Sequence, residues 1–188
     1  NAAVVVGDGS GRYIKRKLVP FGEFVPFEGV LRGVITFFNL PMSTARGGPK
    51  QQALVVAAGL KVAIAICYEV VYSPMVATDA AGADLIVNIS NDTWFGRSIG
   101  PMQHMQIARM RALENGRYLL RATNNGITAI VAPNGKVVSK LPQFEQGVLV
   151  GEVAAMRGRT PYSRWLDIPI VLLSMVLVAV AAVVRHRN

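Results

Sequence analysis

An unbroken apolar run at positions 62–66 leads straight into Cys67, the only cysteine of the chain. Gly59 lies just before the run, and the β-branched residues within it favour a strand over a helix. A short apolar run of this kind indicates a strand that is buried on both faces, as in layered α/β proteins. Cys67 would then lie where this strand ends.

Two interpretations of Cys67 follow from its position. A free cysteine is most often a small core residue. Alternatively, residues 70–81 have the pattern of a helix, which would place Cys67 at a strand-to-helix turn. The partial positive charge of a helix N-terminus favours a thiolate there, and the same geometry exposes the serine nucleophile of some hydrolases.

Length and charge limit the classes of protein to consider. The 188 residues suffice for one domain with a sizeable core. The chain starts at Asn1 without an initiator methionine and runs at once into a strand-like AAVVV, so we expect it to be the C-terminal part of a longer protein. A net charge of +9 suggests nucleic acid or an anionic membrane as partner. The longest basic run is only residues 15–17, which argues against nucleic acid.

The first segment predicts a hairpin with charged residues on its second strand. Residues 2–6 and 12–19 are the two expected strands, joined by a glycine-rich turn. Lys15 lies on the second strand, directly before a rigid Pro-Phe-Gly-Glu turn. That turn would direct Glu23 back toward the lysine.

Residues 21–42, here called the arm, are unusually apolar. Their helical spacing of apolar residues is typical of a helix packed on the core. The alternative is an arm that dips into a bilayer or holds an acyl chain, and the flanking prolines and glycines favour such a loop-borne lid. The arm contains five of the seven phenylalanines, Phe21, Phe24, Phe27, Phe37 and Phe38.

A second buried strand is expected at residues 84–90, and it ends in a polar turn that contains Trp94. Sites form at the carboxyl ends of such strands, so this turn and Cys67 should share one rim. Residues 101–117 are the clearest helix, in which we expect His104 to be a buried, hydrogen-bonded structural residue rather than a catalytic one. The expected apolar stripe of this helix is Met102, Met105, Ala108, Ala112 and Leu113. Further strands are predicted at residues 118–123, 127–132, 136–139 and 148–153.

The tail predicts a membrane anchor. Residues 168–184 carry no charge, and the length of this run is at the short limit for a transmembrane helix. Trp165 suits the headgroup level. We therefore expect a transmembrane helix at 165–184 and a basic tail at 185–188, with a buried core helix as the alternative. Three arginines precede the span and two follow it, so charge alone does not decide the orientation.

Four motifs in order resemble the nitrilase superfamily, and within it the apolipoprotein N-acyltransferase family. They are YIKRKLVPFGEFVP, AICYE, ISNDTWFG and HMQIARMRALENGRYLLRATNNG, and the resemblance covers nearly all of the chain. It implies an α+β fold, namely the four-layer αββα nitrilase-like sandwich without its N-terminal part, over residues 1–160. The transmembrane helix would follow that catalytic domain.

The resemblance also implies roles for single residues. Cys67 would be the nucleophile, Lys15 the catalytic lysine, and Glu23 and Glu69 supporting carboxylates, with the Tyr68 backbone N–H as oxyanion donor. The family's general-base glutamate lies upstream of this sequence, so the chain alone is expected to be inactive. The residues expected at the substrate or lid are Phe21, Phe24, Phe37, Phe38 and Trp94.

The implied reaction is acyl transfer through a cysteine thioester, which divides one difficult step into two. The donor would be a phospholipid, and the acceptor the N-terminal amine of a diacylglyceryl-cysteine lipoprotein. The implied partners are these lipids and the membrane, with no nucleic acid, cofactor or metal. The resemblance places the protein in the bacterial inner membrane, with its catalytic domain facing the periplasm.

Two other classes stay open. A nitrilase-type amidase that hydrolyses a small amide would share the site residues, but it needs neither the apolar tail nor the arm. A non-catalytic, membrane-anchored binding domain would be favoured if the full-length protein also lacked the general-base glutamate.

Overall fold

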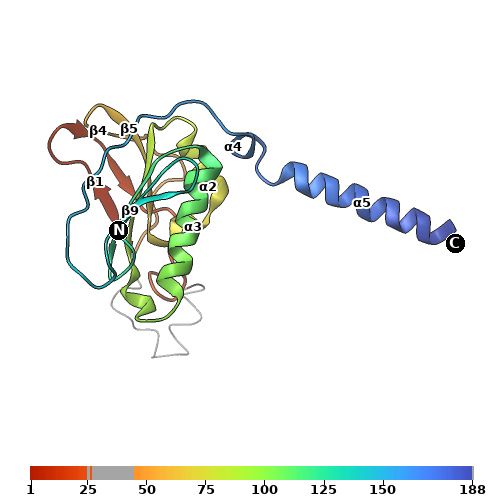
Figure 1. Ribbon diagram of the computed structural model, residues 1–188, viewed down its shortest axis with the longest axis horizontal. Helices are drawn as coiled ribbons and strands as arrows, with labels where there is room; N and C mark the ends of the chain where they lie inside the picture. The colour runs from red at the N-terminus through yellow and green to blue at the C-terminus, as the bar shows by residue number, and fades with distance from the viewer. Residues whose placement is uncertain (25, 27–44, 188) are drawn as a thin grey trace.

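The computed structural model describes residues 1–24, 26 and 45–187. The helical elements are η2 (Cys67–Val71), α2 (Ser73–Ala80), η3 (Asp92–Phe95), α3 (Gly100–Asn115), α4 (Pro161–Trp165) and α5 (Ile168–Arg187), where η denotes a 3₁₀-helix. The strands are β1 (Ala2–Val4), β2 (Gly9–Ser10), β3 (Arg12–Ile14), β4 (Val55–Ala57), β5 (Leu60–Ile66), β6 (Leu85–Asn91), β7 (Leu119–Asn124), β8 (Ala129–Val131) and β9 (Val137–Lys140). Figure 1 shows their arrangement.

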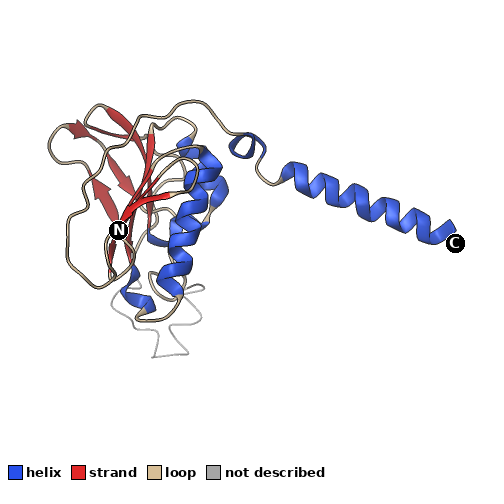
Figure 2. Ribbon diagram, in the orientation of Figure 1, coloured by secondary structure: helices blue, strands red, loops and turns tan. Residues whose placement is uncertain are grey.

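A mixed sheet of seven strands, in the order β2-β4-β5-β6-β7-β8-β9, forms the body of the molecule. Strands β5, β6 and β7 are parallel, with Ile66 opposite Ile89 and Asn91 opposite Asn124, and the outer strands pair antiparallel. Helices α2 and α3 cover one face of this sheet (Figure 2). The carboxyl ends of β5 and β6 therefore meet at one edge, as the sequence predicted.

Small side chains let the helices approach the sheet closely. Ala63 and Ala65 of β5 point into the same core cluster as Ala108 and Ala112 of α3, and both of these helix residues are fully buried. Tyr13 and Val62 belong to a second, smaller cluster on the other side of β5. The strand predicted at residues 62–66 is thus packed on both faces.

The predicted N-terminal hairpin is present as a separate two-stranded sheet, in which Ala2 of β1 lies opposite Ile14 of β3. Three sequence predictions are wrong in detail. The second hairpin strand, expected at residues 12–19, ends at Ile14, so Lys15 lies just after it. The helix expected at residues 70–81 begins as an α-helix only at Ser73, after the 3₁₀ segment η2. Residues 148–153 belong to no strand, and Val148 and Val150 are exposed, because this extended segment makes no ladder with β9.

The C-terminal region leaves the body in two helical steps. The short helix α4 ends at Trp165, and Leu166 takes a left-handed φ of 51° that breaks the path before α5. Helix α5 projects away from the sheet and its helices (Figure 1), and no part of its apolar window is buried. Its mean hydropathy of 2.6 over Ile168–His186 makes it long and apolar enough to cross a membrane.

Candidate active site

Cys67 lies directly after the last residue of β5 and begins η2. Its φ of 54° is in the left-handed region, which a residue with a Cβ adopts only where its surroundings impose it. The residue is partly exposed. Because α2 begins six residues later, the thiol does not lie at the N-terminus of an α-helix, contrary to the sequence prediction.

Glu69 connects this turn to the N-terminal sheet by hydrogen bonds. Its carboxylate is completely buried, and Oε2 accepts hydrogen bonds from the Ile66 N–H at 2.9 Å and from the Tyr13 hydroxyl at 3.0 Å. Oε1 accepts from the backbone N–H groups of Arg16 and Lys17, at 2.6 and 3.0 Å. These two residues follow Lys15, so Glu69 ties the segment that carries the lysine to the turn that carries Cys67.

Lys15 and Glu23 form an ion pair in which the lysine is buried and the carboxylate is partly exposed. The lysine is 1% exposed, and its Nζ lies 2.7 and 2.8 Å from the two carboxylate oxygens of Glu23. The turn after Pro20 presents the glutamate, and the Val19 N–H and the Asn1 amide also donate to its carboxylate. The structure thus brings Lys15 and Glu23 together, as the sequence predicted.

A further layer of contacts supports the segment that carries Lys15, just after β3. The Arg16 guanidinium donates to the Tyr13 hydroxyl at 3.0 Å and pairs with Asp79 of α2. Burial, together with the negative charge of Glu69, raises the pKa of Tyr13 far above its usual value. Tyr13 therefore stays a neutral hydrogen-bond donor to Glu69 at any physiological pH.

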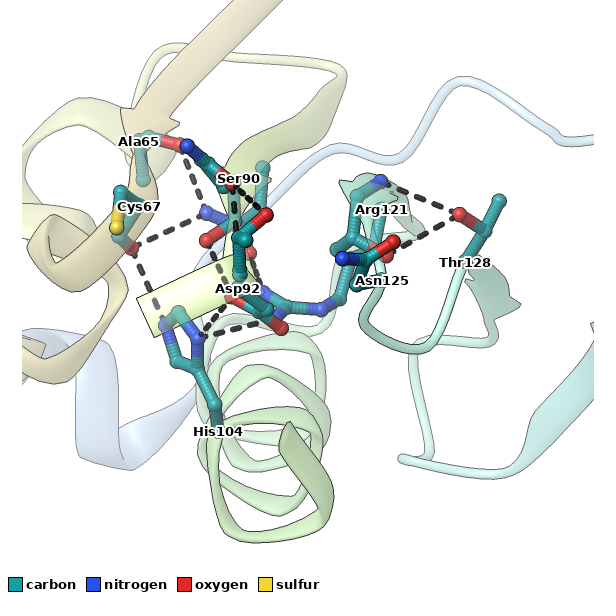
Figure 3. A network of polar contacts seen from close by, with 12 residues as sticks. Ala65, Cys67, Ser90, Asp92, His104, Arg121, Asn125 and Thr128 are labelled. Atoms are coloured by element: carbon teal, nitrogen blue, oxygen red, sulfur yellow. Dashed lines mark hydrogen bonds and ion pairs between the residues drawn. The ribbon is translucent and has the colours of Figure 1, made fainter. Parts of the chain in front are cut away.

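A second buried network holds the backbone of Cys67 from the side of α3 (Figure 3). The imidazole Nε2 of His104 lies 3.3 Å from the Cys67 carbonyl oxygen, and Asn88 Nδ2 donates to the same oxygen at 3.5 Å and to the Ala65 carbonyl at 2.8 Å. Arg121 of β7 in turn donates to the Asn88 amide oxygen. The network therefore holds the backbone carbonyl of Cys67 rather than its thiol.

Asp92 organises this network from the start of η3. One of its oxygens lies 2.9 Å from His104 Nδ1 and accepts from Ser90 Oγ at 2.6 Å, and the other accepts from Arg121 at 2.7 Å. Burial alone would raise the pKa of Asp92, but the hydrogen bonds from His104 and Ser90 and the charge of Arg121 outweigh it, and the pKa falls below its usual value. Asp92 is therefore a fixed anion. A Cβ at Gly126 would meet its Oδ2 at 2.2 Å, so this position requires glycine.

The residues expected to contact substrate are distributed around this edge of the sheet. Trp94 is 62% exposed on η3, and Tyr68 lies with its ring edge-to-face against Tyr72. Phe21 and Phe24 lie in the turn that presents Glu23, where the Phe21 N–H donates to the Phe24 carbonyl at 2.7 Å. Phe37, Phe38 and most of the arm lie outside the described residues.

Sequence reasoning identified His104 as a buried, hydrogen-bonded residue but missed its partners. The available signal was the polar character of two strands that were predicted to be buried. Asn88 and Ser90 interrupt β6, and Arg121 interrupts β7. A polar side chain in a buried strand must find hydrogen-bond partners, so these three residues indicated a network.

The arrangement is suited to nucleophilic acyl chemistry. A partly exposed thiol, a buried lysine ammonium and the backbone N–H groups at the start of a helical turn are the groups that form and stabilise a tetrahedral oxyanion. Within the described part of the chain, no three His, Cys, Asp or Glu side chains form a group that would hold a metal ion.

Comparisons with known proteins identify the family of the chain. The carbon-nitrogen hydrolase family model matches residues 1–162. Apolipoprotein N-acyltransferase of Azotobacter vinelandii is 54% identical over 188 residues, all of this chain and 36% of its own. The enzyme of the same name from Pseudomonas putida is 54% identical over 177 residues, 94% of this chain and 35% of its own. The chain thus spans about a third of the length of these relatives.

The fold has a solved counterpart. The crystal structure of the C. elegans NitFhit protein superposes with a TM-score of 0.54 at 20% sequence identity, covering 71% of this chain and 32% of that one. This likeness confirms the nitrilase-like α+β fold.

Proposed function

Because the chain belongs to the carbon-nitrogen hydrolase family, we propose that it is the C-terminal part of an apolipoprotein N-acyltransferase. One observation carries the proposal. The family model ends at residue 162, whereas the similarity to the Azotobacter relative runs through all 188 residues and so includes the apolar helix α5. An amidase that acts on a small soluble amide has no use for this helix.

In the proposed reaction, the Cys67 thiolate attacks the ester carbonyl of a phospholipid. The lysine ammonium and the Tyr68 N–H stabilise the resulting oxyanion, and the C–O bond then breaks to leave a thioester on Cys67 and a lysophospholipid. The N-terminal amine of a diacylglyceryl-cysteine lipoprotein next attacks the thioester, and the C–S bond breaks to return the thiol. A base in the upstream part of the protein takes the thiol proton and gives it to the departing lysophospholipid oxygen. It later takes the amine proton and returns it to the Cys67 sulfur.

The proposal assigns residues 1–160 to the catalytic domain, residues 165–184 to the membrane anchor and residues 185–188 to a basic tail. The arm at about residues 21–42, with Phe37 and Phe38, and the exposed Trp94 would contact the lipid substrates. The domain would face the periplasm from the bacterial inner membrane. The exposed apolar helix supports the membrane location, since an apolar helix of about 30 Å matches the hydrocarbon core of a bilayer.

The test is a two-step assay on the full-length enzyme. Incubation with a phospholipid that carries a labelled acyl chain should give a hydroxylamine-labile label on Cys67, and addition of a diacylglyceryl-cysteine peptide should move the label to its N-terminal amine. Cys67→Ala should fold and take up no label. Label retained by Cys67→Ala would refute the nucleophile assignment, and transfer of the acyl group only to water would instead favour an amidase.

A further inference from the structure

Two buried side chains hold the carbonyl oxygen of Cys67 from the side of α3. His104 is 3% exposed and Asn88 is fully buried, and their nitrogens lie 3.3 and 3.5 Å from that oxygen. The thiol itself receives none of these bonds. This geometry therefore does not place His104 or Asn88 to take the proton of the thiol.

The peptide unit explains what holding this carbonyl achieves. The Cys67 C=O and the Tyr68 N–H belong to one planar group and point in opposite directions, so a contact that fixes the oxygen also fixes the direction of the N–H. Tyr68 is the second residue of η2, a position where a helical N–H has no acceptor within its own helix. The left-handed φ of Cys67 costs energy, and the plane would rotate if nothing held it.

His104 is itself held in one orientation. Its Nδ1 lies 2.9 Å from an Asp92 oxygen and 3.0 Å from Arg121, and its ring lies edge-on to Phe95. Since a carbonyl can only accept, Nε2 must carry a hydrogen and donate it to Cys67. The Asp92–Arg121 pair fixes the ring so that this hydrogen points at the carbonyl.

We propose that His104 is a positioning residue for acyl transfer, which acts by holding the Cys67–Tyr68 peptide plane so that the Tyr68 N–H points at the developing oxyanion. Asn88 does the same from the neighbouring strand. This inference rests on the proposed function only for the identity of the acyl donor, because any ester that acylates Cys67 forms the same oxyanion.

The test compares two substitutions in the full-length enzyme. In His104→Gln, the side-chain amide nitrogen can take the place of Nε2 and donate to the Cys67 carbonyl. In His104→Asn, the shorter amide keeps the contact with Asp92 but cannot reach that carbonyl. The control is Asn115→Ala, which removes a buried amide from the far end of the same helix, where it donates to the Arg111 carbonyl at 2.8 Å.

Two rates are measured for each protein. Acylation by p-nitrophenyl acetate passes through an oxyanion, whereas alkylation of Cys67 by iodoacetamide does not. All rates are expressed per folded molecule, counted from the monodisperse fraction in size-exclusion chromatography. We expect His104→Asn to lower kcat for acylation about 100-fold with KM little changed, as for loss of one oxyanion donor, and to alter alkylation less than about 3-fold. His104→Gln should stay within about 10-fold of wild type in acylation, and Asn115→Ala should match wild type.

Equal losses of acylation and alkylation in His104→Asn would overturn the inference, because His104 would then support only the local fold. Wild-type acylation by His104→Asn would overturn it as well. Should His104→Asn not fold, Asn88→Ala gives the same comparison from the other donor, with a smaller expected loss because its bond is longer. Acylation of the wild-type enzyme by p-nitrophenyl acetate but not by phospholipid would refute the proposed function alone. The rates with the ester would still decide the role of His104.

Discussion

The two carboxylates of the candidate site, Glu23 and Glu69, have different hydrogen-bond partners and therefore different tasks. Four donors occupy Glu69, namely the Tyr13 hydroxyl and the backbone N–H groups of Ile66, Arg16 and Lys17. Its carboxylate has no capacity left for a substrate, so Glu69 joins two pieces of backbone. Glu23 instead neutralises a lysine that is 1% exposed.

The Lys15–Glu23 pair allows structural and catalytic roles to be separated. Removing one partner of a buried ion pair leaves an uncompensated charge and typically costs about 3–5 kcal/mol, whereas replacing both partners is far less costly. We expect Lys15→Met and Glu23→Gln each to lower the free energy of unfolding strongly. The double variant should recover most of that loss in chemical denaturation of the full-length enzyme.

Acylation of Cys67 should not recover with stability. The double variant lacks the ammonium that we propose stabilises the oxyanion, so its acylation rate per folded site should stay about 100-fold or more below wild type. A double variant that regains both stability and acylation would show that Lys15 only fills space. Alkylation by iodoacetamide serves as the control that the Cys67 turn is intact.

At the scale of elements, α3 connects the candidate site to the C-terminal region. Its 16 residues span about 24 Å, with His104 near one end. At the other end, Thr160 donates to the Glu114 carbonyl, and Arg117, just past the helix, donates to the Gly158 carbonyl at 2.8 Å. The helix therefore fixes both the network behind Cys67 and the segment that leads to α5.

The sequence predicted α3 well as a helix but assigned part of its buried face wrongly. Met102 and Leu113 of the expected apolar stripe are 55% and 46% exposed, while the polar residues His104, Arg111 and Asn115 are buried. Apolar periodicity locates a helix, but it cannot show that a buried polar network has taken over part of its face. The strand prediction at residues 148–153 was wrong for a related reason. Alternation of apolar and polar side chains does not reveal whether a neighbouring strand is available for pairing.

Arg117 should control the attachment of the C-terminal region. It is 2% exposed, and it also donates to the Ala83 carbonyl at 2.7 Å. Arg117→Leu should leave these carbonyls unpaired and lower the free energy of unfolding by about 2–4 kcal/mol. Limited proteolysis of the full-length enzyme in detergent should then cut residues 154–160 faster than in wild type.

Arg109→Gln is the matched control. This arginine lies on α3, the helix that precedes Arg117, and donates to the Gly135 carbonyl at 2.9 Å, away from α4. Its loss should leave the cleavage rate at residues 154–160 unchanged. Equal cleavage in both variants would show that Arg117 does not anchor the C-terminal region.

At the scale of the whole molecule, the sequence predicted the tail more completely than the site. A charge-free run is a local property, and α5 begins at Ile168, the first residue of that run. The helix expected at 165–184 starts three residues later than predicted, because α4 ends at Trp165 and Leu166 breaks the path. The turn after Pro20 predicted the pairing of Lys15 with Glu23. Cys67 lies 44 and 52 positions from these two residues, and the resemblance to a known family assigned all three to one site in advance. The Asn88–Asp92–His104–Arg121 network had no such guide.

The orientation of the chain in the membrane follows from the proposed reaction and can be measured directly. Diacylglyceryl lipoproteins are presented at the outer face of the inner membrane in this proposal, so the body should lie in the periplasm and α5 should end in the cytoplasm. In the full-length protein with Cys67→Ala, a cysteine at Lys136, an exposed residue between β8 and β9, should react with a membrane-impermeant maleimide on intact spheroplasts. A cysteine at Asn188 should react only after lysis.

The two arginines after the span agree with this orientation, although the three before it weaken the bias. The reverse labelling pattern would place the catalytic domain in the cytoplasm and would favour a soluble amide as its substrate over a lipoprotein.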